Sequence, residues 1–237
     1  MIFMKSIKQY ILPIAALCSL TFAACNKLQD GFDYNKSYYD NKVDMTVYDF
    51  MKSKPELFSG MLAAIDYVDQ DANYKDVKAM YTSTGNTFLL LHNTALINLE
   101  DANSYFMQKR FLVTDPTSPD YNKTLAGTDW SQYKREDIAE LLRYHVMKGR
   151  QEYANLNSTP RWVNTFAISA TNDSAKIHIY LQGTRDGFLF INNYIGAPST
   201  FLEVKPRTPN LLATNGVIHV MNRFAVEPTR QIIANNK

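Results

Sequence analysis

The spacing of apolar residues changes once along this 237-residue chain, near Gly149. Before this point, apolar residues such as Met61 and Ile65 recur at intervals of three or four, which is the period of an amphipathic helix. After it, they alternate with polar residues, as at Ile177 and Ile179, which is the period of a half-buried strand. Helices followed by strands predict an α+β domain rather than a parallel sheet of βαβ repeats.

Local signals place the elements of the first half. Thr46 and Asp49 have the spacing of a capping box, and Pro55 suits the first turn of a following helix. The segment 101–134 is rich in Pro, Gly, Asp and Thr and predicts a long surface loop. We expect helices from residues 47 and 55, a strand at 86–91, a short helix through Leu96 and Leu99, and a helix at 136–147 ended by Gly149.

The second half predicts a set of strands. Asn215-Gly216 is a turn signal immediately before the last of them. The expected strands are 162–169, 176–182, 187–191, 200–205 and 217–226.

The first 25 residues have the layout of an export signal. Two lysines precede an apolar run at 11–22, and two alanines precede Cys25. This layout resembles a bacterial lipoprotein leader, although Phe22 stands where Leu is more usual. The resemblance implies cleavage between Ala24 and Cys25 and a lipid on Cys25. It also implies a place at the outer membrane. Residues 26–30 resemble, in part, the charged surface-export signals of such lipoproteins and favour the cell surface, with a periplasm-facing position as the alternative.

A plain secretory signal and a membrane-spanning helix are the alternatives. The stretch from Ile11 to Ala24 contains Pro13 and is shorter than the roughly 20 apolar residues that a span needs. Residues 26–42 are mostly polar and predict a flexible tether with a span of about 20–25 Å. The predicted parts are a signal peptide (1–24), a lipidated tether (25–43), one domain (44–228) and a C-terminal tail (229–237).

Charge and cysteine content limit the function of the mature chain. Removing residues 1–24 lowers the basic residues from 25 to 23, which equals the 23 acidic residues. A neutral chain gives no electrostatic case for binding nucleic acid. Cys18 lies in the leader, so Cys25 has no partner for an internal disulfide. The domain must therefore be stabilised by its hydrophobic core.

Several segments together resemble the fasciclin (FAS1) family. The most specific is NGVIHVMNRFAVEP at 215–228, which resembles the C-terminal signature of the family. LLRYHV at 141–146 is similar to its central tyrosine–histidine motif, and TFLLLHNTAL at 87–96 to its first signature. The departures are Leu91, where Pro is usual, and His92-Asn93, where Thr-Asp or Thr-Asn is usual. The resemblance also includes 47–65 and suggests an insertion near 112–130.

This resemblance implies a FAS1-like twisted β-wedge with helices packed alongside, and a non-enzymatic role in adhesion or extracellular binding. In some members the tyrosine–histidine pair contributes to cell-adhesion contacts, which makes Tyr144 and His145 candidate binding residues. His145 shares an apolar helix face with Ile138 and Leu142, however, so a buried structural imidazole is the competing interpretation. Tyr144 is expected to be partly exposed, and His219 to be a half-buried structural residue.

No motif for catalysis, cofactor binding or metal binding stands out. The chain has no G-x-S-x-G, P-loop or H-x-x-x-H pattern, so we predict no catalytic residues, no cofactor and no metal. Ser174 lies in Asp-Ser-Ala, which matches an O-glycosylation pattern of the Bacteroidetes group, and is a candidate modification site.

Three roles remain open. The first is adhesion to, or binding of, an extracellular protein or glycan partner, with the membrane contacted through the N-terminal lipid. The second is a glycan- or nutrient-binding accessory of an outer-membrane uptake system, and the third is a structural envelope protein. The second role predicts an exposed aromatic cluster among Trp130, Tyr133, Trp162 and Tyr194.

Overall fold

The structure is a computed structural model that describes residues 40–184, 187–197 and 204–237. The predicted leader, Ala24, Cys25, most of the tether and most of the predicted strand 200–205 lie outside these ranges. Residues Asn41–Lys237 group into one unit by their contacts. In the described part of the chain, no helix has the length and apolar character needed to cross a membrane.

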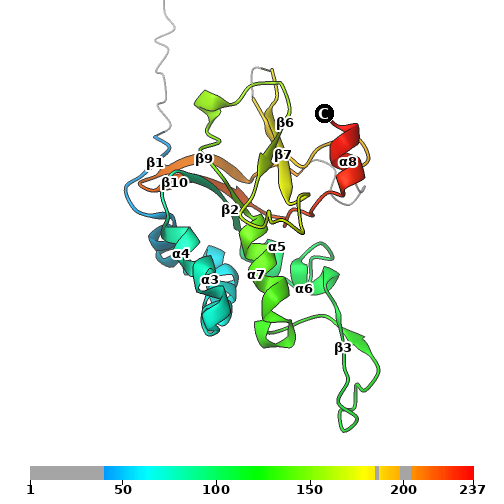
Figure 1. Ribbon diagram of the computed structural model, residues 1–237. Coiled ribbons are helices and arrows are strands. Elements are labelled where there is room, and N and C mark those ends of the chain that lie inside the picture. Colours follow the sequence, from blue (N-terminus) through cyan, green and yellow to red (C-terminus); the bar gives the residue numbers. More distant parts are fainter. Residues whose placement is uncertain (1–39, 185–186, 198–203) are drawn as a thin grey trace, which may run out of the picture. The chain divides into compact units, whose positions relative to one another are not determined.

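Most helices lie in the first part of this unit and most of the longer strands in the second (Figure 1). The helices are α2 (Val47–Ser53), α3 (Pro55–Asp69), α4 (Lys75–Thr82), α5 (Asn93–Leu96), α6 (Tyr105–Gln108), α7 (Arg135–Tyr144) and α8 (Arg230–Asn235). Short 3-10 turns are η2 (Ala72–Tyr74), η3 (Trp130–Gln132) and η4 (Tyr153–Asn155). The strands are β1 (Lys42–Val43), β2 (Asn86–Leu91), β3 (Phe111–Leu112), β4 (Thr124–Leu125), β5 (Val146–Met147), β6 (Arg161–Asn164), β7 (Lys176–Leu181), β8 (Leu189–Ile191), β9 (Thr208–Ala213) and β10 (Gly216–Met221).

A parallel pair of strands joins the two halves of the sequence. In the main sheet, with strand order β1-β9-β10-β2-β5, β10 pairs with β2 from Gly216↔Asn86 to Met221↔Leu91. Both strands are apolar and almost fully buried, as expected for a parallel pair covered on two faces. Figure 1 shows α3, α4 and α7 on one side of this sheet and the antiparallel sheet β6-β7-β8 on the other. The mixed architecture confirms the α+β prediction.

Local capping signals act as predicted. The Thr46 hydroxyl accepts a hydrogen bond from the Asp49 backbone N–H at 3.2 Å and so caps α2. Pro55 occupies the first turn of α3, where its missing N–H leaves no bond unmade. His92 replaces the usual capping residue before α5, and its Nδ1 accepts from the Thr94 N–H at 3.1 Å.

Several predicted boundaries are wrong. The short helix expected through Leu99 ends at Leu96, and the strand expected at 162–169 ends at Asn164. In two further cases the chain leaves the predicted element early. The helix predicted at 136–147 ends at Tyr144, since Val146 and Met147 leave it to pair with β2 as strand β5. Gly149 instead adopts φ +84° in the turn that follows. The strand predicted at 217–226 ends at Met221, after which 222–229 form an irregular segment.

Several elements were not predicted. The segment 101–134 contains α6, η3 and the β3–β4 hairpin, which projects beyond the helices at the place of the expected insertion (Figure 1). β9 was missed because Pro209 and Asn210, the latter at φ +60°, argue against a strand. Within the predicted C-terminal tail, residues 230–235 form α8.

Candidate functional site

His145 lies at the end of α7 and is fully buried. Its Nδ1 lies 2.7 Å from the Leu141 carbonyl oxygen, and its Nε2 accepts the Ala225 N–H at 2.8 Å. This pair of contacts assigns the proton to Nδ1 and suits a neutral ring. Burial lowers the pKa of His145 to about 4, opposed by the bond to Leu141. The imidazole therefore connects α7 to the segment after β10 and offers no free nitrogen to a ligand.

Tyr144 is also buried, with 4% of its surface exposed, so the expectation of partial exposure is wrong. Its hydroxyl accepts from Asn192 Nδ2 at 2.9 Å and lies 3.0 Å from the Lys176 carbonyl oxygen and 3.3 Å from that of Val226. The helical period places Tyr144 away from the apolar face of α7, but β7 and residue 226 cover this side of the helix. Burial raises the pKa of Tyr144 well above its ordinary value, so the hydroxyl stays protonated.

His219 is more buried than predicted. It lies in β10 with none of its surface exposed, and its Nδ1 accepts from the Asn210 N–H at 2.9 Å. Its Nε2 lies 3.0 Å from the Gln151 carbonyl oxygen. Burial lowers the pKa of His219 to about 4, so this ring too is a neutral structural residue.

A hollow of about 630 Å³ lies beside the buried tyrosine–histidine pair, and we call it the α7 groove. One wall is the face of α7 that carries Asp137, Glu140, Leu141 and Tyr144, whose spacing places them on one side of a helix. The other walls are residues 109–111, 132–134 and 224–227 together with Tyr105.

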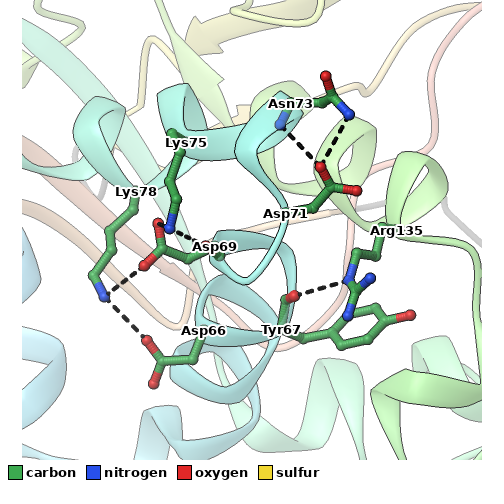
Figure 2. A network of polar contacts seen from close by, with 8 residues as sticks. All are labelled: Asp66, Tyr67, Asp69, Asp71, Asn73, Lys75, Lys78 and Arg135. Atoms are coloured by element: carbon green, nitrogen blue, oxygen red, sulfur yellow. Dashed lines mark hydrogen bonds and ion pairs between the residues drawn. The ribbon is translucent and has the colours of Figure 1, made fainter.

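A contact between α3 and the start of α7 holds this wall in place (Figure 2). Arg135 Nε donates to the Tyr67 carbonyl oxygen at 3.2 Å, and its guanidinium carbon lies 4.8 Å from the centre of the Tyr67 ring. At the end of α3, Lys78 lies 3.3 Å from Asp66 and 3.2 Å from Asp69. These ion pairs join α4 to α3, are partly exposed and contribute little. The Arg135 contact is the one that joins α7 to α3.

Two carboxylates, those of Glu140 and Glu227, lie at the end of the α7 groove nearest Asn172. Asn172 Nδ2 donates to both Glu140 and Glu227 at 3.2 Å, and thereby joins the helix wall to the C-terminal wall. Burial raises the pKa of Glu140, with a smaller contribution from the Glu227 charge, while the bond from Asn172 opposes the shift. The pair is held by an amide rather than by a cation.

Ser174 belongs to the same polar cluster. Its hydroxyl lies 3.0 Å from Glu227 Oε1 and 3.1 Å from Asn172 Oδ1, and the residue is half-buried in the connection between β6 and β7. Glycosylation of Ser174 stays a prediction. Over the described ranges, no three His, Cys, Asp or Glu side chains lie close enough to share a metal ion.

The aromatic residues that could mark a glycan site fall into two separate groups. Trp130 is buried, donates from Nε1 to the Gly60 carbonyl oxygen at 3.0 Å, and packs 6.2 Å from Tyr133. Trp162 packs 5.4 Å from the buried Tyr194 on the β6-β7-β8 sheet. The exposed four-residue cluster expected for a glycan accessory is therefore absent from these described positions.

Comparison with known proteins identifies the domain. Residues 111–227 match the sequence model of the family described as the fasciclin domain. The chain carries a fasciclin domain. The matched residues include the central motif at 141–146 and nearly all of the C-terminal signature at 215–228, and so confirm the resemblance in that half.

The solved structures also contain a fasciclin match. The FAS1 domain pair from the insect cell adhesion molecule Fasciclin I shares 15% identity with this chain, at a TM-score of 0.40. The match covers 72% of this chain and 46% of that one, so this chain spans less than half the length of that structure. A search of curated proteins returns no sequence that matches.

Apart from Tyr133 and Tyr144, the residues that line the α7 groove were not singled out from the sequence. Glu140 could have been found, because its spacing from Asp137 and Tyr144 repeats the period of a helix. Glu227 and Asn172 carry no such signal, since they meet Glu140 only after the chain has folded.

Proposed function

We propose that this fasciclin domain is a non-enzymatic binding module displayed on the outer surface of a bacterial outer membrane. Its leader and Cys25 would supply a lipid anchor, and the tether would give the domain reach from the membrane. Fasciclin domains are generally linked to adhesion or binding, which supports this class of function. The partner would be an extracellular protein or glycan that contacts the α7 groove.

One observation carries the choice of the α7 groove as the contact site. Charged side chains of both signs surround an apolar floor formed by Leu141 and Phe224, while Tyr144 and His145 are buried as structural residues. Apolar surface surrounded by polar groups is the usual composition of a binding site. The separation of the aromatic residues into two groups favours this function over a glycan-uptake accessory.

Anchoring is tested with the full chain in cells. We expect Cys25→Ser to move the protein from the membrane fraction to the soluble fraction, because the variant lacks the thiol that would carry lipid. Cys18→Ser is the matched control and should remain in the membrane fraction, since this residue lies within the leader. A Cys25→Ser protein that stays with the membrane would exclude the lipid anchor.

Partner binding is tested with an array of immobilised extracellular proteins and glycans, probed with the full chain carrying Cys25→Ser. We expect retention on at least one class of extracellular molecule. A uniformly blank array would reject the binding function and favour a role in which the domain only packs within the envelope.

A further inference from the structure

Basic side chains gather near the start of α7 in the α7 groove, and two glutamates lie at its other end, with Asp137 between them. At the start of α7, Lys134 lies with Lys109 and Arg110, because Phe111 packs 6.3 Å from Tyr133 and brings the two segments together. Lys109 and Lys134 are exposed and form no ion pair with any described residue. With Lys109, Arg110 and Lys134 against the one carboxylate of Asp137, this end of the α7 groove carries an excess of positive charge and suits an anionic group.

The opposite end is acidic. Glu140 and Glu227 share the Asn172 amide and form no ion pair within the described ranges. Arg143, the nearest cation along α7, instead makes a two-point contact with Asp76 at 2.9 and 2.7 Å. Two carboxylates without a cation favour a basic group on a ligand.

The two ends are about 9 Å apart along the helix axis, because Lys134 and Glu140 are six residues apart and a helix rises 1.5 Å per residue. An extended peptide advances about 3.3 Å per residue, so three residues cover this distance. Tyr105, Tyr133 and Phe224 give the α7 groove apolar surface, which suits apolar side chains. A neutral sugar would leave both charged ends unpaired, and a single small ion would satisfy only one of them.

We propose that the α7 groove binds an extended segment of a partner protein, in which an acidic and a basic residue stand three positions apart with apolar residues between them. This proposal rests on the proposed binding function and specifies its partner as a peptide. The acidic residue would face Lys109 and Lys134, and the basic residue would face Glu140 and Glu227.

The test uses fluorescently labelled hexapeptides and the full chain carrying Cys25→Ser, with binding measured by anisotropy. The probes are Gly-Asp-Leu-Leu-Lys-Gly and Gly-Lys-Leu-Leu-Asp-Gly, against the like-charge peptides Gly-Asp-Leu-Leu-Asp-Gly and Gly-Lys-Leu-Leu-Lys-Gly. We expect one unlike-charge peptide to bind about fivefold more tightly than either like-charge peptide, as two modest exposed ion pairs would give. Equal binding of all four peptides would overturn the proposal.

A charge-reversal variant locates the effect. In Lys109→Glu with Lys134→Glu, binding of the preferred peptide should weaken about threefold or more, and binding of the two-lysine peptide should strengthen. The matched control reverses Lys54 and Lys237, which are exposed and lie outside the α7 groove. An unchanged peptide ranking in the groove variant would overturn the proposal.

The array separates this proposal from the proposed function. A glycan-only result, or a protein partner bound equally by wild-type and groove variant, would overturn the peptide assignment while the binding function stands. A blank array would reject the binding function, whereas the peptide ranking is measured independently of it.

Discussion

Acidification should destabilise this domain through two buried imidazoles, those of His145 and His219. Each ring accepts a backbone N–H on one nitrogen, from Ala225 and Asn210 respectively, and a protonated ring cannot accept that bond. Burial lowers the pKa of each from 6.5 to about 4. Both rings must therefore lose their proton before the domain can reach its most stable form.

The sign and size of the effect follow from linkage. Between pH 6.5 and 4 the unfolded chain binds more protons than the folded one, so stability is full above pH 6.5 and falls as the pH falls. At pH 5 the difference is about 0.9 proton for each histidine, or about 1.2 kcal/mol of unfolding free energy per pH unit. From pH 7 to pH 4.5 each of the two histidines should remove about 2.4 kcal/mol.

The assay is urea unfolding of the full chain carrying Cys25→Ser at several pH values from 7 to 4.5. His145→Gln and His219→Gln retain a donor and an acceptor but do not titrate. Each should therefore remove about 0.9 proton from the uptake on unfolding at pH 5, which lowers the slope of unfolding free energy against pH by about 1.2 kcal/mol per pH unit. Burial also lowers the pKa of His92 and His178, but these residues are unchanged in every variant. Slopes identical to the parent protein would refute the reasoning, whatever the variants' stability at pH 7.

Two further predictions concern stability and use urea unfolding at pH 7. Tyr144→Phe should lower the free energy of unfolding by about 1–2 kcal/mol, because the buried Asn192 amide loses its hydroxyl acceptor. An unchanged free energy of unfolding would mean that water replaces the hydroxyl. Gly216→Ala should cost about 1–3 kcal/mol, because a Cβ there would lie 2.5 Å from the Asn86 carbonyl oxygen. Gly183→Ala, with no neighbour closer than 3.4 Å, is the control and should change stability by less than about 0.5 kcal/mol; equal losses at the two glycines would contradict the steric argument.

The start of α2, the start of α3 and the strand β2 could be predicted because each depends on residues a few positions apart. Thr46 caps α2 through Asp49, and Pro55 fits the first turn of α3 by its own geometry. The change of hydrophobic period near Gly149 likewise predicted the α+β class, and the family motifs at 141–146 and 215–228 predicted the fasciclin match.

The candidate site depended on tertiary structure. Tyr144 occupies the helix face expected for a partly exposed residue, yet β7 and residue 226 cover it. The apolar pattern of the helix continues past His145, but Val146 leaves the helix and pairs with Phe88 in the main sheet. Two walls of the α7 groove, residues 109–111 and 224–227, are about a hundred residues apart in the chain, and packing brings them together. Neighbouring residues thus determined where elements begin, whereas burial and long-range pairing decided where they end and which side chains line the groove.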